Sequence, residues 1–69
     1  MTVEECRAAR RLEGRMVHVA LDNGARVDDS ALISVGRNSV WMFVNGDDRF
    51  YPVDRVIAIW ESQPYRAAA

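Results

Sequence analysis

Only a few residues in this chain have the types that catalysis or metal binding requires. The chain contains one histidine, His18, and one cysteine, Cys6. A Cys/His zinc site needs more ligands than these two, and an internal disulfide needs a second cysteine, so the sequence excludes both. Two pairs of neighbouring aspartates, Asp28–Asp29 and Asp47–Asp48, have the carboxylates that can bind a divalent cation or share a proton.

A structural role explains each of these residues better than chemistry does. Alternation places His18 on the outward face of a strand, and no carboxylate–hydroxyl partner accompanies it in the sequence pattern, so we interpret it as a surface or packing residue. The aspartate pairs fall at a predicted bend and a predicted hairpin tip, where turn chemistry favours aspartate. Cys6 falls on an apolar helix stripe and is expected to pack as a small apolar group. We therefore expect no enzymatic activity, no cofactor and no bound metal.

The basic residues are a second candidate for function. All nine are arginine, but the net charge is −1, so the total does not favour nucleic acid. The densest group could be a solvated helix face with ion pairs such as Glu4–Arg7, or a contact for phosphate or an acidic partner. A steep dependence of binding on salt would identify phosphate contacts. The residues that we expect to contact a partner or nucleic acid are Arg7, Arg10, Arg11, Arg15 and Arg37.

A short helix over residues 2–12 must position most of these arginines. Thr2 and Glu5 form a capping box, in which each side chain binds a free backbone N–H of the other residue. Such a short helix is marginal alone and must pack on the rest of the fold. Gly14 ends it.

The rest of the chain reads as strands separated by turns. The four glycines, at 14, 24, 36 and 46, fall at nearly even intervals, and Asn23–Gly24 and Asn45–Gly46 are strong hairpin signals. We predict strands over residues 15–21, 25–35, 39–44, 49–53 and 56–60. The second is interrupted near Asp28–Asp29–Ser30, which indicates a bulge or sharp bend of the kind that small barrels use. The pattern therefore predicts a mainly β fold, a five-stranded small barrel with a short N-terminal helix.

The third and fifth strands are apolar on both faces, which predicts that both faces are covered. Exposed aromatic residues could stack on bases, but isoleucine cannot, so an interface explains this surface better than a stacking platform. The residues expected at this interface are Trp41, Phe43, Tyr51, Ile57, Ile59 and Trp60.

The length of 69 residues predicts one small domain over residues 1–62 and a flexible C-terminal tail over 63–69. A domain this small buries little surface, and without a disulfide or a metal we expect it to associate with copies of itself. No apolar run is long enough to cross a membrane, and the start of the chain lacks the basic and apolar regions of a signal peptide. We expect a cytoplasmic protein.

Two stretches resemble known families. Residues 12–24, LEGRMVHVALDNG, resemble the opening pattern of the Sm-like (SH3-like) barrel: an apolar residue, a glycine, alternating valines, a leucine and an Asp/Asn-Gly turn. Residues 34–38 and 50–54 do not match the base-reading and late signatures of Sm and Hfq-type proteins. Residues 32–44 and 53–57 resemble the Rho-binding antiterminator family and WYL modules. The resemblance covers about residues 12–60 and implies a binding module in transcription or RNA metabolism, without catalysis.

Taken together, these features predict a non-enzymatic interaction module that regulates transcription or RNA handling by binding a protein partner, with the arginine-rich helix as its contact element. Two other functions stay open. One is direct binding of single-stranded nucleic acid through the arginines, with Trp41 or Tyr51 as stacking groups. The other is a structural subunit of a homo-oligomer.

Overall fold

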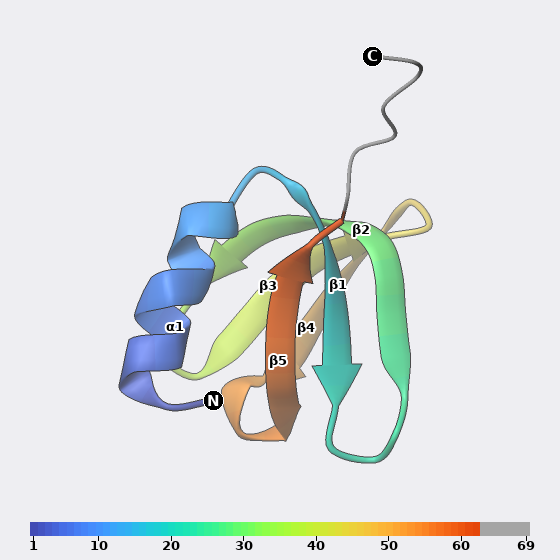
Figure 1. The fold of residues 1–69 in the computed structure, drawn as a ribbon. Coiled ribbons are helices and arrows are strands. Elements are labelled where there is room, and N and C mark those ends of the chain that lie inside the picture. Colours follow the sequence, from blue (N-terminus) through green and yellow to red (C-terminus); the bar gives the residue numbers. More distant parts are fainter. Residues whose placement is uncertain (63–69) are drawn as a thin grey trace, which may run out of the picture.

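Residues 1–62 of the computed structural model form one antiparallel sheet of five strands, preceded by a short helix (Figure 1). The strands are β1 (Met16–Leu21), β2 (Arg26–Val35), β3 (Ser39–Val44), β4 (Asp47–Pro52) and β5 (Val56–Glu61). They lie in the order β4-β3-β2-β1-β5. The predicted mainly β fold with an N-terminal helix is confirmed. The predicted tail at 63–69 lies outside the described residues.

The predicted helix is α1 (Val3–Ala9), continued by the 3-10 turn η1 (Arg10–Leu12). Both halves of the capping box are present: the Glu5 N–H donates to Thr2 Oγ1 at 3.1 Å, and the Thr2 N–H donates to Glu5 Oε1 at 2.8 Å. These bonds satisfy backbone donors that a helix start leaves free. Among residues 1–62, no helix has the length and apolar character needed to cross a membrane.

The second hairpin is tighter than the sequence predicts. Asn45 and Gly46 both have positive φ, at 52° and 84°, as both central residues of a type I′ turn require. Two residues therefore suffice for the turn. The prediction that Asp47 and Asp48 belong to the hairpin tip is wrong, because they pair with Val44 and Phe43 as the first residues of β4.

β2 is bent, as predicted. Its register with β1 shifts between Val17 and Val19, and opposite this shift Asp29 has a φ of 47°. A bulge of this kind leaves one residue unpaired and turns the strand. The first half of β2 pairs with β1 and the second half with β3, so that Ala31 lies opposite both Met16 and Phe43.

The core lies on the inner face of the bent sheet. Val17, Val19, Leu32, Val40 and Met42 are fully buried. The helix covers this face with Cys6 and Ala9, so the expectation that Cys6 packs as an apolar group is confirmed.

The sheet is not closed into the predicted barrel. β4 and β5 are its two edges, and they do not pair with each other within residues 1–62. Between them Pro52 ends β4, and the 3-10 turn η2 (Val53–Arg55) carries the chain from one edge of the sheet to the other. β5 then pairs with β1.

Candidate interaction site

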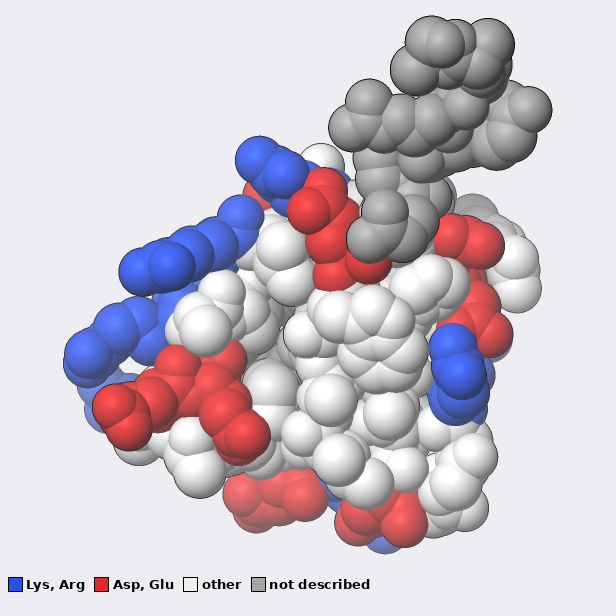
Figure 2. Space-filling view, in the orientation of Figure 1, with Lys and Arg blue, Asp and Glu red and all other residues white. Residues whose placement is uncertain are grey.

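A groove of about 360 Å³ lies between α1 and β5. Its lining is apolar except for two charged side chains, Glu5 and Arg11, which both lie on the helical side. Figure 2 shows the uncharged surface over β5 beside the charged side chains of α1. The lining residues are Met1, Glu5, Ala8, Ala9, Arg11, Leu12, Ile57, Ala58 and Ile59.

Contacts with the sheet hold the helical wall of this groove in place. The Arg10 Nε–H donates to the Val35 carbonyl at 3.0 Å, and the Val35 N–H donates to Glu13 Oε2 at 2.8 Å. The Met1 ammonium donates to the carbonyls of Val53 and Val56, at 3.0 and 3.1 Å. The groove is therefore formed by elements that are tied together at both ends of the helical segment.

The helix next to the groove carries charge of opposite sign at its two ends. Figure 2 shows Arg side chains along one part of α1 and η1 and acidic side chains at the other end. Arg7 and Arg11 are exposed, and within residues 1–62 no carboxylate lies within 4.0 Å of either. Arg11 itself lines the groove. The guanidinium groups of Arg7 and Arg11 are therefore available to an acidic group of a partner.

The other arginines predicted as contacts are placed differently. Arg10 already donates to a backbone carbonyl. Arg15 pairs with Glu61 at 3.0 Å, with both side chains well exposed. Arg37 is exposed and lies in the turn between β2 and β3. The predicted arginines thus do not form one site, and only Arg11 is at the groove.

The predicted aromatic surface lies elsewhere, on the outer face of β3 and β4. Trp41 and Phe43 are 37% and 45% exposed. Trp41 stacks on Phe50 with ring centroids 5.5 Å apart, and its Nε1–H donates to Asp48 Oδ1 at 3.0 Å. Phe50, which is 61% exposed, was missing from the predicted interface. Counting residues outward from the Asn45–Gly46 turn would have placed it opposite Trp41.

Two residues predicted at the interface, Tyr51 and Ile59, lie on the inner face of the sheet, where Ile59 also lines the groove. Tyr51 lies opposite Val40 and Ile59 lies opposite Val19, and both are half-buried against the core. The strand alternation explains this, because each shares its face with a fully buried valine. Ile57, by contrast, is 57% exposed beside the groove.

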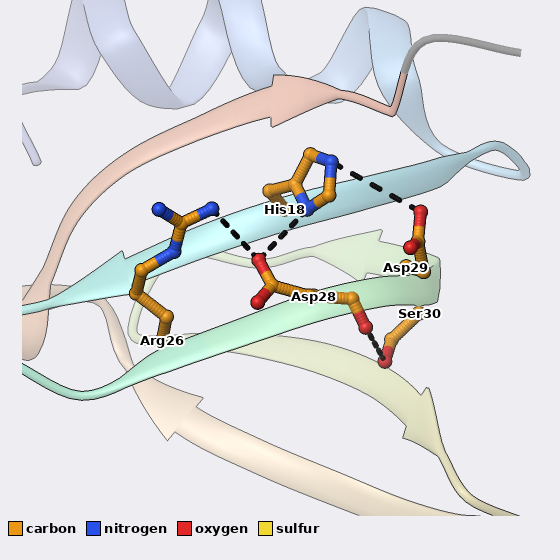
Figure 3. A network of polar contacts seen from close by, with 5 residues as sticks. All are labelled: His18, Arg26, Asp28, Asp29 and Ser30. Atoms are coloured by element: carbon orange, nitrogen blue, oxygen red, sulfur yellow. Dashed lines mark hydrogen bonds and ion pairs between the residues drawn. The ribbon is translucent and has the colours of Figure 1, made fainter.

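His18 has a carboxylate partner that the sequence pattern did not reveal. The His18 Nδ1–H donates to Asp28 Oδ1 at 2.9 Å, and its Nε2 lies 4.0 Å from Asp29 (Figure 3). Arg26 donates to the same Asp28 oxygen at 2.8 Å. The Trp60 ring lies 5.6 Å from the His18 ring and 5.4 Å from the Arg26 guanidinium. These contacts tie the start of β2 to β1 and β5.

The charges and hydrogen bonds of this network fit a structural role. The Arg26 guanidinium and then the His18 imidazole lower the pKa of Asp28 below its ordinary value, so the carboxylate stays charged. Ser30, the hydroxyl in the network, is buried and donates to the Asp28 carbonyl. It is therefore not placed to act as a nucleophile for His18. No group of three or more metal-binding side chains occurs in the part of the chain that the structure describes.

The structure thus defines a small mainly β domain with an apolar groove beside an arginine-bearing helix. No family model matches the chain, and no curated protein matches it.

Proposed function

We propose that this chain is a non-enzymatic cytoplasmic module that binds a protein partner and thereby regulates transcription or RNA handling. The observation that carries the proposal is the groove between α1 and β5, which is apolar inside and has Arg11 at its side. The partner supplies an apolar side chain for the groove and acidic groups for Arg11 and Arg7.

The form of the groove suits a protein segment. Protein interfaces combine an apolar centre with a polar rim, and arginine is among the residues that contribute most of their binding energy. Here Leu12, Ile57 and Ile59 supply the apolar centre. The two charged side chains of the lining, Glu5 and Arg11, lie on its helical side.

The link to transcription or RNA handling is supported by sequence resemblance. Residues 12–60 resemble the Sm-like barrel, the Rho-binding antiterminator family and WYL modules. These are binding modules of transcription or RNA metabolism, and the resemblance implies the same for this chain.

Capture of the partner tests this function. We would tag the full chain at its C-terminus, since the Met1 ammonium is engaged by Val53 and Val56. Three forms would be compared in extracts of the source cells: the original chain, Arg7→Glu/Arg11→Glu, and the control Arg49→Glu/Arg55→Glu. The control makes the same change in charge at exposed arginines that do not line the groove.

We expect the original chain and the control to retain one defined protein of transcription or RNA metabolism, and the Arg7/Arg11 variant to lose it. Equal retention by all three forms would contradict the proposal, as would retention of no defined protein. Circular dichroism of the variants establishes that each is folded.

Direct binding of single-stranded nucleic acid is the alternative, favoured by the free guanidinium groups of Arg7 and Arg11. Against it, the exposed ring of Trp41 lies beside the Asp48 carboxylate, which repels phosphate. Titration of a fluorescent oligonucleotide separates the two functions. If the chain binds nucleic acid, the oligonucleotide should bind at about 50 mM salt, and its affinity should fall steeply as the salt concentration rises. This binding should be lost in Arg10→Glu/Arg11→Glu. The protein-binding function predicts no such signal.

A further inference from the structure

The two edges of the sheet differ in how accessible they are. β5 lies beside α1, and its ladder with β1 is interrupted by a register shift between Ala20 and Leu21. β4 pairs with β3 without any shift, from Val44↔Asp47 to Ser39↔Pro52. Every residue of β4 is exposed except Tyr51, which is half-buried. Among residues 1–62, β4 is therefore the open, regular edge.

The hydrogen-bonding pattern shows which backbone groups of β4 are free. The Val53 N–H donates to the Asn38 carbonyl at 2.9 Å, which continues the register of the ladder. Because an antiparallel strand directs alternate residues to its neighbour, Tyr51, Arg49 and Asp47 direct their backbone groups to β3. Asp48, Phe50 and Pro52 direct theirs outward. Pro52 has no N–H, so the outward direction costs it no hydrogen bond.

We propose that two copies of this chain pair through β4, antiparallel, about a two-fold axis at Phe50. In this arrangement Phe50 exchanges both backbone hydrogen bonds with Phe50 of the second copy. The Asp48 N–H donates to the Pro52 carbonyl of the second copy, and the reverse bond forms by symmetry. The two sheets then continue into one another. This inference is independent of the proposed function, because it uses the edge of the sheet away from the groove.

The side chains on the outer face favour this pairing. Phe50 lies opposite Trp41 and stacks on it, at 61% and 37% exposure. Pairing about Phe50 places the two phenylalanines side by side and extends the aromatic row across both copies. Cross-strand aromatic pairs stabilise sheets, and exposed apolar patches on small proteins mark interaction sites.

Charge selects this register among those that β4 can form. Moving the two-fold axis one residue, from Phe50 to Arg49, places Arg49 opposite Arg49 of the second copy. Moving it a further residue places Asp48 opposite Asp48 of the second copy. One step to the other side places Phe50 opposite Pro52, which has no N–H with which to return the Phe50 hydrogen bond. The next step places Pro52 opposite itself, without any N–H to donate. Like charges directly opposite one another destabilise a sheet. Only the register centred on Phe50 avoids all four conflicts, since it places Arg49 opposite Tyr51 and Asp48 opposite Pro52.

The mass of the full chain in solution tests the proposal. We expect light scattering at micromolar concentrations to give twice the chain mass of 7.8 kDa. Phe50→Glu introduces two facing carboxylates and should give a single chain, whereas the matched control Ile57→Glu on β5 should stay a dimer. A single-chain mass for the original protein would overturn the proposal, as would a dimeric Phe50→Glu. A larger assembly that Ile57→Glu disrupts would overturn it too, because it would indicate pairing of β4 with β5 between copies.

A cross-link provides a second measurement. Phe50→Cys places two cysteines opposite each other at the axis, within the reach of a disulfide. Cys6 is buried, so it does not compete. Mild oxidation should convert Phe50→Cys into a covalent dimer, while Ile57→Cys should form no covalent dimer. Equal cross-linking of the two variants, or none in either, would contradict the two-fold pairing.

Discussion

The Nδ1 of His18 lies 2.9 Å from Oδ1 of Asp28, so the one histidine of the chain is held across the first hairpin by a carboxylate. Arg26 binds the same oxygen. Figure 3 shows the three side chains close together where β1 and β2 pair, and the His18 ring and the Arg26 guanidinium also lie 5.6 and 5.4 Å from the Trp60 ring. This arrangement holds the bent strand in place, and it makes stability depend on the charge of one aspartate.

Lowering the pH should destabilise the fold through Asp28. Its folded pKa lies below the ordinary value of 3.8, first because of Arg26 and then because of His18. The unfolded chain therefore takes up the proton first, so the stabilisation is present above that value and is lost as the pH falls through the folded pKa. Urea unfolding at several acidic pH values should show this loss.

Asp28→Asn should reduce the pH dependence without abolishing it. The pKa of Glu5 is also lowered, chiefly by the Thr2 backbone N–H, so Glu5 contributes a loss in the same direction. An unchanged profile in Asp28→Asn would show that the Asp28 contacts do not stabilise the fold.

Gly46→Ala should destabilise the protein through the backbone alone. A Cβ at this position would meet no atom within 4 Å, but the φ of 84° is left-handed. The left-handed conformation costs an ordinary residue about 1–2 kcal/mol. Urea unfolding should detect this loss, while the control Asn45→Asp keeps a favourable turn sequence and should change stability little. Equal stability of Gly46→Ala and the original protein would contradict the assigned turn.

Neighbouring residues of β3 should respond very differently to truncation. Met42 is fully buried, and Met42→Ala should cost about 2–5 kcal/mol, which a small domain can hardly tolerate. Phe43 is 45% exposed, and Phe43→Ala should cost less than about 1 kcal/mol. Thermal unfolding followed by circular dichroism compares the two. A similar loss for both would contradict the assignment of inner and outer faces.

Local sequence signals were sufficient to predict most of the fold. The capping box at Thr2 and Glu5, the Asn–Gly turns and the alternation of valines each act over a few residues, and the structure agrees with all of them. The open sheet could not be predicted in this way, because the position of β5 depends on contacts between distant segments. The hairpin at Asn45 was predicted too wide, since aspartates are common in turns as well as at strand starts.

The surfaces were harder to predict than the strands. The partnership of His18 and Asp28 was within reach, since counting outward from a three-residue turn, Asp22–Asn23–Gly24, places Leu21 opposite Ala25, Val19 opposite Val27 and His18 opposite Asp28. The groove was not, because it forms only when α1 packs beside β5, far along the chain. The inward direction of Ile59 follows from its pairing with Val19, which no local pattern contains.

Mapping the contact on the chain itself tests the central claim most directly. The ¹⁵N-labelled full chain would be titrated with the unlabelled captured partner, and amide shifts would be recorded for each residue. We predict that the perturbed amides cluster around the groove, at Ala8, Leu12 and Ile57, and that those of Asp48 and Phe50 do not move. Perturbations confined to the outer face of β3 and β4, with the groove unaffected, would contradict the assignment of α1 and β5 as the binding site.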